Sequence, residues 1–375
     1  MKLWALTALL GAIAVAIGTA SGASSTARAG ASQARKNLRT FGEIESLAMA
    51  GSRVAFDVGA RENVKVRCNK VYAWNVQTGK RKKVSGKKTC DADSTSTGFG
   101  VPELAVAGKR FAWIVNWGGN TESEDYLYTS SWRRPKERKL ASASRTGEDY
   151  ESLAGNWIGG LVGSGSLLAV NRWYADDHGV VTRAKLLRIR RGLKTIKAGT
   201  DTVVARSADA GDIAVARPSG EVAVYSQAGT VLATVTPGSF RDVALSGKKL
   251  LVLTQAKVLD VYSIATGHLL HAWPVKGAWR TRERLRSPSR LDAYANIAVY
   301  SAKNKVYALR LATGKNVVLA QAPRTLMPVV GTTPRLQIGK PGVVYAYDTF
   351  NRKSLKIYGH VVFMPMKTVR TALAR

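Results

Sequence analysis

Cysteine and histidine are scarce in this chain of 375 residues, which contains two cysteines and four histidines. Metal sites and thiol or imidazole catalysis need several such side chains close together, so few candidates exist. The sequence also lacks the G-x-S-x-G, H-E-x-x-H and P-loop motifs of common hydrolases, zinc proteases and nucleotide-binding proteins. We therefore predict no catalytic residue, no metal site and no cofactor.

Acidic residues are also few, since 25 Asp and Glu stand against 57 Lys and Arg, a formal net charge of +32. Such a charge attracts anionic partners, namely acidic or teichoic-acid-like polysaccharides, phospholipid headgroups or nucleic acid. The cations are spread along the chain and not gathered in one tail, so we expect nucleic acid to bind only through nonspecific charge. A generic role of the charge in solubility is an equally open alternative.

Long apolar runs are absent except near the N-terminus, where Leu3 to Ile17 are apolar or small. Lys2 precedes this run and Ala27-Arg28-Ala29 follows it, which is the layout of a signal peptide cleaved before Gly30. The run of about 15 residues is shorter than the roughly 20 needed to cross a bilayer. We expect residues 1–29 to be removed, leaving a monomer that is secreted or associated with the cell envelope and has no transmembrane segment.

The two cysteines, Cys68 and Cys90, form an even pair in a chain that we expect to meet an oxidising compartment. Their midpoint is residue 79, at the centre of a Thr78-Gly79 turn. In a regular hairpin about that turn the two residues would face each other, at a separation compatible with a bridge. We predict one structural disulfide.

One unit recurs along the chain: a short apolar strand, a turn built on glycine, and a second strand. A third segment follows, such as "VYAWNV" at 71–76 or "VYALRL" at 306–311, alternating with the period of two typical of a strand with one buried face. Thr-Gly then makes a tight turn into a fourth strand. Seven copies begin near Leu47, Leu104, Leu161, Val203, Val243, Leu291 and Leu336.

Seven units of four strands, A to D, predict an all-β fold: a seven-bladed β-propeller of four-stranded antiparallel blades. We place the propeller at 43–368, a linker at 30–42 and a C-terminal tail at 369–375, and expect a terminal strand to close the ring. The repeats resemble the WD40-like and PQQ-like propeller repeats of exported bacterial proteins. The Trp-Asp ending and the full Thr-Gly-x-x-x-Trp pattern are missing, so the resemblance does not imply a quinone cofactor.

The connections of a propeller emerge on two opposite faces. The C–D turns here are tight, whereas we expect longer B–C loops at 58–69, 116–125 and 171–182 and a long connection at 275–290. Function tends to lie on loops carried by a rigid scaffold, so we predict a functional B–C/D–A face and a plain A–B/C–D face.

These predicted loops carry aromatic and arginine side chains that suit stacking on sugar rings and pairing with anions. Ordinary packing between neighbouring loops is the alternative. The candidate binding residues are Trp117, Arg172, Trp173, Tyr174, Trp279, Arg280, Arg282 and Arg284.

Together these features predict a secreted, non-catalytic binding or scaffold propeller that recognises a protein or an anionic cell-envelope polymer. The alternative is a propeller-fold polysaccharide lyase or hydrolase that uses Asp176, Asp177 or His178. That alternative requires these side chains to converge with Glu122, Glu124 or Asp125 in one pocket.

Overall fold

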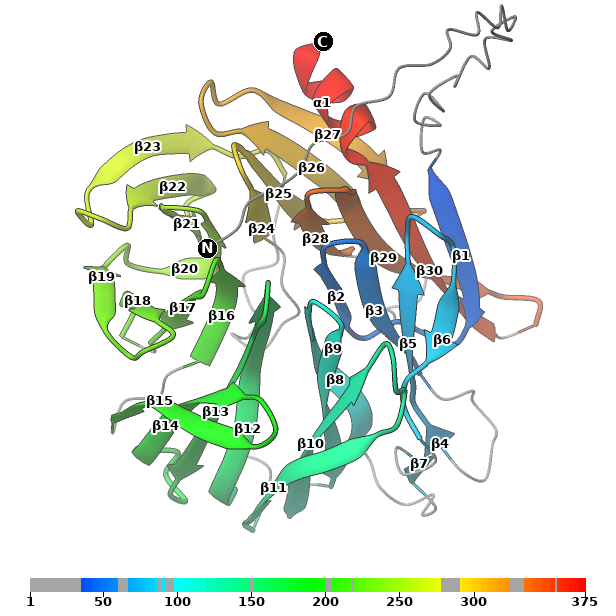
Figure 1. The fold of residues 1–375 in the computed structure, drawn as a ribbon, viewed down its shortest axis with the longest axis vertical. Coiled ribbons are helices and arrows are strands. Elements are labelled where there is room, and N and C mark those ends of the chain that lie inside the picture. The colour runs from blue at the N-terminus through cyan, green and yellow to red at the C-terminus, as the bar shows by residue number, and fades with distance from the viewer. Residues whose placement is uncertain are drawn as a thin grey trace, which may run out of the picture. The chain divides into compact units, whose positions relative to one another are not determined.

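The computed structural model describes residues 35–59, 67–86, 90–91, 98–119, 121–148, 152–199, 204–217, 219–277, 291–323, 334–354 and 356–375. In these ranges the chain forms antiparallel β-sheets, and the only helix there is α1 (Met366–Ala374). The fold is an all-β propeller with four-stranded antiparallel blades, as predicted (Figure 1). Within the described part of the chain, no helix is long and apolar enough to span a membrane.

The strands recur in the order inner, second, third and outer. The inner strands are β2 (Leu47–Ala50), β8 (Gly98–Ala107), β12 (Ala154–Ser164), β16 (Val204–Asp209), β20 (Phe240–Ser246), β24 (Leu291–Tyr294) and β28 (Arg335–Gly339). The second strands are β3 (Arg53–Val58), β9 (Arg110–Gly118), β13 (Leu167–Ala175), β17 (Asp212–Ala216), β21 (Lys249–Thr254), β25 (Ile297–Ala302) and β29 (Gly342–Asn351). Six of the predicted repeats begin within an inner strand, and the seventh begins at the residue before β16.

The third and outer strands complete the sheets. The third strands are β5 (Lys70–Asn75), β10 (Glu122–Ser131), β14 (Val181–Ile189), β18 (Val222–Ser226), β22 (Val258–Ser263), β26 (Lys305–Arg310) and β30 (Lys356–Pro365). The outer strands are β6 (Arg81–Lys83), β11 (Arg138–Thr146), β15 (Leu193–Gly199), β19 (Val231–Val235), β23 (Leu269–Pro274), β27 (Asn316–Gln321) and β1 (Lys36–Phe41).

The sheet count differs from the prediction of seven separate blades. Five four-stranded sheets stand separately, and β8 to β15 form one continuous eight-stranded sheet. Its two halves, β8–β11 and β12–β15, are joined because β11 pairs with β12 through Arg145↔Gly155 and Thr146↔Ala154. Such a join depends on residues from two repeats, so the repeat pattern could not reveal it.

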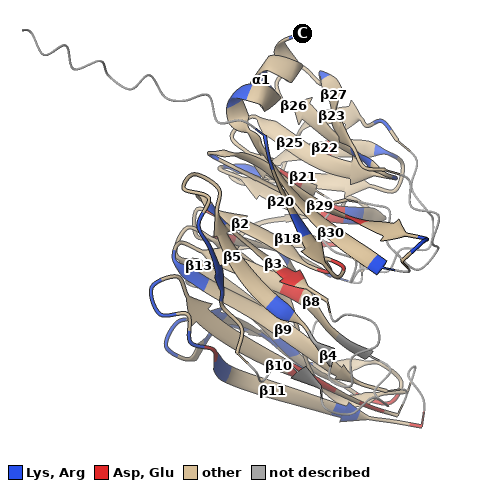
Figure 2. Ribbon diagram, turned by 90° about the vertical axis from the view of Figure 1, so that its right-hand side faces the viewer, with Lys and Arg blue, Asp and Glu red and all other residues tan. Residues whose placement is uncertain are grey.

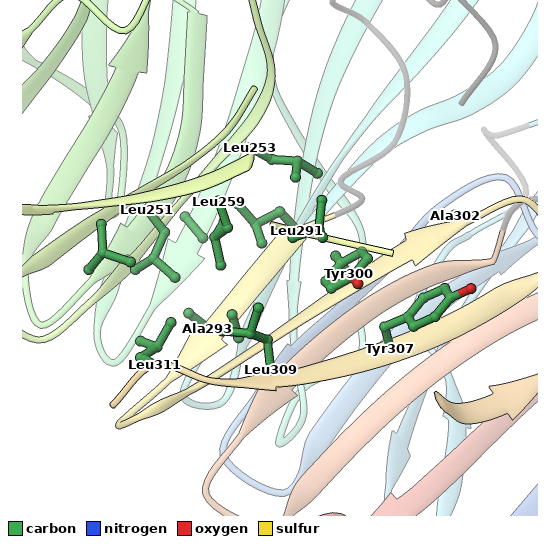
Figure 3. Packing of buried hydrophobic residues seen from close by; sticks show 14 residues of the cluster. Leu251, Leu253, Leu259, Leu291, Ala293, Tyr300, Ala302, Tyr307, Leu309 and Leu311 are labelled. Carbon is green, nitrogen blue, oxygen red and sulfur yellow. The ribbon is translucent and has the colours of Figure 1, made fainter. Parts of the chain in front are cut away.

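Inner strands that follow one another in the chain contact one another in space. The contacts run from β2 through β8, β12, β16, β20 and β24 to β28, and β28 contacts β2. A hydrophobic cluster fills each interval between sheets. Between β20–β23 and β24–β27, for example, Leu251, Leu253 and Leu259 pack on Tyr300 and Leu309 (Figure 3).

The last sheet is completed by the N-terminal strand. β1 pairs antiparallel with β30 from Lys36↔Phe363 to Phe41↔Tyr358, in the order β1-β30-β29-β28 (Figure 1). This confirms that a terminal strand closes the ring. The range 30–42, expected to be a linker, contains β1, and the range 369–375, expected to be a tail, lies largely in α1.

The Thr-Gly repeat makes the turn between third and outer strands. Gly79, Gly267 and Gly314 adopt φ values of 76°, 70° and 69°, which glycine tolerates at no steric cost. The preceding threonine hydroxyl accepts the N–H of the residue after the glycine, at 3.4 Å for Lys80, 3.3 Å for His268 and 3.4 Å for Lys315. The motif recurs because both residues stabilise the same turn.

Two of the loops predicted to be long are short. The ranges 116–125 and 171–182 mostly continue strands, with Trp117 opposite Glu124 and Tyr174 opposite Arg183. The glycines of "NWGGN" suggest a loop, but Gly118 adopts a φ of 144° and still pairs with Ser123. The other two predicted extensions fall largely in 60–66 and 278–290, outside the described residues.

Candidate functional site

A cavity of about 1220 Å³ lies among the inner strands, and residues from all seven of them line it. We call it the central cavity. Its charged lining residues are Glu45, Glu103, Asp125, Asp209, Asp242, Asp292, Arg145, Arg206, Arg335 and Lys340. Since carboxylates and cations both face the space, the central cavity does not have the charge expected of a site for a polyanion.

Side chains link each inner strand to the next around the central cavity. Six of the inner strands pair with only one neighbour in their sheet, and β12 pairs with its second neighbour, β11, at two residues only, so N–H groups on the other edge need acceptors. Those acceptors, which we call junction acceptors, come from the preceding unit. The pairs are Glu45 with Val101 (2.8 Å), Glu103 with Gly160 (3.1 Å) and Leu161 (2.6 Å), Asn171 with Ala205 (2.7 Å), Ser207 with Leu245 (2.9 Å), Asp242 with Leu291 (3.0 Å), Asp292 with Ile338 (2.8 Å), and Gln337 with Met49.

Loss of hydration raises the pKa of several junction carboxylates. It raises the pKa of Glu45 to about 7, with a further contribution from the charge of Glu43, against the hydrogen bond from Val101. Desolvation also raises the pKa of Asp292 to about 7, and the charges of Asp209 and Asp242 add to this effect. These groups are partly protonated at neutral pH, so their charge contributes little to attracting a ligand.

The raised pKa of Asp292 makes a prediction about stability. The folded state holds this proton up to about pH 7, whereas the unfolded carboxyl loses it near its ordinary pKa of 3.8, so stability is lost as pH rises between these values. Asp292→Asn removes the titration. We expect the stability of the wild type relative to this variant to fall by up to roughly 4 kcal/mol between pH 4 and pH 8, at about 1.4 kcal/mol per pKa unit. Urea unfolding of both proteins across this range measures it, and a constant difference would contradict it.

Five strands of the eight-stranded sheet carry a connected row of side chains at one edge of the central cavity. Arg145 donates to Asp125 at 2.7 Å, and both side chains are buried. The guanidinium of Arg145 lies 3.6 Å from the centre of the Trp157 ring, and Trp157 stacks on Trp173 with ring centroids 6.0 Å apart. Asn116 extends the row by donating to Asp125 at 2.8 Å.

This row, which we call the Arg145 row, explains why β11 and β12 join. The pair Arg145–Asp125 links β11 to β10 in the first half of the sheet, and the Trp157–Trp173 stack continues the row onto β12 and β13 in the second half. Asp125 also accepts the N–H of Ile158 at 3.1 Å, across the join. Sequence reasoning missed Arg145 and Trp157, because one arginine in "LASASRT" looks like an ordinary exposed strand residue.

The structure brings only one of the predicted binding residues to the central cavity, namely Trp173. Arg172 and Tyr174 are its neighbours on β13 and point to the opposite face of the sheet, because side chains alternate along a strand. Trp117 is half-buried on β9. The binding role of these residues stays a prediction, and Trp279, Arg280, Arg282 and Arg284 lie outside the described residues.

The residues named for the lyase or hydrolase alternative do not gather in one pocket. Asp176 accepts the N–H groups of His178 (3.1 Å) and Val180 (2.8 Å) in its own loop. Asp177 and His178 have exposed side chains, at 68% and 83%. Of the six candidates, Asp125 alone lines the central cavity, where it is paired with Arg145. No group of three His, Cys, Asp or Glu residues within the described ranges is placed to hold a metal ion.

The cysteines lie in a separate two-stranded sheet formed by β4 (Arg67–Cys68) and β7 (Cys90–Asp91). The backbone register places Cys68 directly opposite Cys90. The two cysteines are therefore opposite each other, as predicted. They are paired in the separate β4–β7 sheet and not in the β5–β6 hairpin about the Thr78-Gly79 turn. Their side chains lie outside what the structure describes, so the disulfide stays a prediction.

The fold defines the class of this protein as a β-propeller, and the comparisons with known proteins add no family. No family model and no curated protein matches the chain. Among solved structures, the computationally designed protein Ika8 has a TM-score of 0.44 at 12% identity, covering 87% of this chain and 97% of that one. Sqt1 of Saccharomyces cerevisiae has a TM-score of 0.44 at 11% identity, covering 88% and 98%. Similarities at this level carry no argument about function.

Proposed function

We propose that this protein is a non-catalytic binding or scaffold propeller whose partner is an anionic polymer of the cell envelope. The observation that carries the proposal is where the acidic side chains lie. At least seven of the 25 carboxylates are buried or half-buried and accept backbone N–H groups, namely Glu45, Asp57, Glu103, Asp125, Asp242, Asp292 and Asp348.

Because these carboxylates are used inside the fold, the surface is more basic than the composition alone indicates. Figure 2 shows a red segment within the strands between β3 and β8, and blue segments at several turns. A surface with this charge attracts polyanions through long-range electrostatics, and the attraction weakens as salt screens it.

The proposal includes export and a disulfide. The signal-peptide pattern of residues 1–29 supports secretion, and the opposed backbone positions of Cys68 and Cys90 support a bond between them. Mass measurement of the secreted protein after alkylation without reductant tests both. A chain that still begins at Met1 would contradict export, and two alkylated cysteines would contradict the bond.

We also propose that the eight-stranded sheet corresponds to two blades, which gives seven in total. The ring of seven inner strands, each in contact with the next, supports this count. The join at β11–β12 involves two residue pairs, whereas the adjoining strand pairs β10–β11 and β12–β13 involve eight each.

Titration with a polyanion tests the proposed function. We expect the mature protein to bind long-chain polyphosphate at low salt and to lose affinity steadily as NaCl rises, with no binding to neutral dextran. Fluorescence anisotropy of labelled polymer measures both. No binding at low salt, or an affinity that salt does not change, would contradict an anionic partner.

A further inference from the structure

A second cavity, of about 440 Å³, lies on the face that the tight turns form. It is placed between the β10–β11 connection, the start of β9 and the end of β14, and we call it the turn groove. Five cations line it, together with one carboxylate, Glu137. The cations are Arg110, Arg134, Lys136, Arg138 and Arg190.

None of these five cations forms an ion pair with a described residue. Glu137, which accepts the N–H of Gly86 at 2.7 Å, is the one carboxylate beside these five cations in the described lining. The side chains of Arg134, Lys136, Arg138 and Arg190 are exposed, and Arg110 is half-buried. Among the described residues, the lining of the turn groove therefore carries a concentrated net positive charge.

The protein holds part of this charge in place. Arg110 donates to the carbonyl of Ile189 at 2.9 Å and also to that of Ser166, so the guanidinium is fixed across the two halves of the sheet. Arg138 donates to the carbonyl of Arg191 at 2.6 Å. Desolvation lowers the pKa of Arg110, and the nearby charges of Arg188 and Arg190 lower it further. Like charges held together in this way favour a bound anion, which relieves their repulsion.

The floor of the turn groove adds polar groups to this charge. The buried residues Phe111, Leu168 and Ile189 line it, and so do Thr129, Ser130 and Ser131. Ser130 is 8% exposed, and its hydroxyl has no hydrogen-bond partner among the described residues. Fixed arginine forks beside hydroxyl groups suit tetrahedral oxyanions, which accept several hydrogen bonds at once.

We infer that the turn groove binds the phosphate or sulfate groups of a linear anionic polymer. A cavity of about 440 Å³ admits a few such groups but not a folded protein, and the exposed cations at its mouth allow the polymer to continue across the surface. This inference rests on the proposed function for the nature of the partner. It differs from the sequence-based expectation by placing binding on the A–B/C–D face.

Two variants test the inference. Arg134→Gln with Arg190→Gln removes two exposed groove cations whose side chains make no hydrogen bond with a described residue. Arg352→Gln with Lys353→Gln removes two exposed cations from the β29–β30 turn, on the opposite face. Polyphosphate binding is measured by anisotropy across a salt series, with thermal unfolding of each protein as a check on folding.

We expect the groove variant to lose affinity by about tenfold or more at low salt, with the salt slope reduced by about 2. The control variant should bind as the wild type does. Binding of dextran sulfate through the same residues would support the inference with sulfate as the source of the oxyanion. Equal binding by the groove variant and the wild type would overturn it, as would tighter binding of polygalacturonate, whose charges are carboxylates, than of polyphosphate. Absence of binding by the wild type would instead contradict the proposed function.

Discussion

Replacing Arg145 by alanine is expected to lower the free energy of unfolding by about 3–5 kcal/mol. The side chains of Arg145 and Asp125 are only 4% and 5% exposed, so removal of the guanidinium leaves a buried carboxylate without its charged partner. The variant also loses the contact of Arg145 with the Trp157 ring, at the point where the two halves of the sheet join. Urea unfolding followed by tryptophan fluorescence measures the change.

Arg183→Ala is the matched control for this prediction. Arg183 is an exposed arginine of the same sheet, and its guanidinium lies 5.0 Å from the Tyr174 ring, so we expect a loss below about 1 kcal/mol. The double variant Arg145→Met with Asp125→Asn removes both charges and should recover much of the lost stability. A loss at Arg145 no larger than that at Arg183 would show that the Arg145 row does not stabilise the fold.

Replacing Glu103 by alanine is expected to lower the free energy of unfolding by about 2–4 kcal/mol, because two backbone N–H groups of β12 lose their acceptor. Glu103 accepts the N–H of Gly160 at 3.1 Å and of Leu161 at 2.6 Å. Glu103→Gln keeps one acceptor oxygen, so it should cost about half as much. Urea unfolding at neutral pH gives both values.

The control for the junction acceptor is Glu122→Ala, which removes an exposed carboxylate from the same half of the sheet. Its expected effect is within about 0.5 kcal/mol. If Glu103→Ala and Glu103→Gln unfold alike, the hydrogen bonds to β12 are not what Glu103 contributes.

The strands and turns could be predicted because they depend on neighbouring residues. The alternation of "VYALRL" predicts a strand with one buried face, and β26 (Lys305–Arg310) occupies that segment. Its four consecutive buried positions show that both faces are covered, because Tyr307 and Leu309 pack in one cluster between sheets and Val306 and Ala308 in the next. The Thr-Gly turn depends on one glycine and one hydroxyl, both visible in the sequence.

The junction acceptors could not be predicted because their partners are distant in the chain. Glu45 and Val101 are 56 residues apart, and Gln337 and Met49 are 288 apart. A glutamate before a strand looks the same in sequence whether it faces solvent or a neighbouring sheet. The repeat pattern therefore shows that units exist but not which side chains connect them.

The lengths of two loops could not be predicted for a related reason. The segments "NWGGN" and "NRWYADDHGVVT" indicate long loops by composition, but cross-strand pairing extends the strands through most of them. Trp117 and Trp173 proved to be strand residues, while the β10–β11 connection carries Arg134 and Lys136 into the turn groove. The length of a turn reflects backbone geometry and does not determine the charge of the side chains exposed on it.

Lysine acetylation footprinting tests the central claim most directly, because it reports which face an anionic polymer covers. Lys136 lines the turn groove, and Lys353 lies in the β29–β30 turn on the opposite face. We expect polyphosphate to slow acetylation of Lys136 and to leave Lys353 unchanged, as measured by mass spectrometry of the mature protein. Protection of Lys353 without protection of Lys136 would contradict the account.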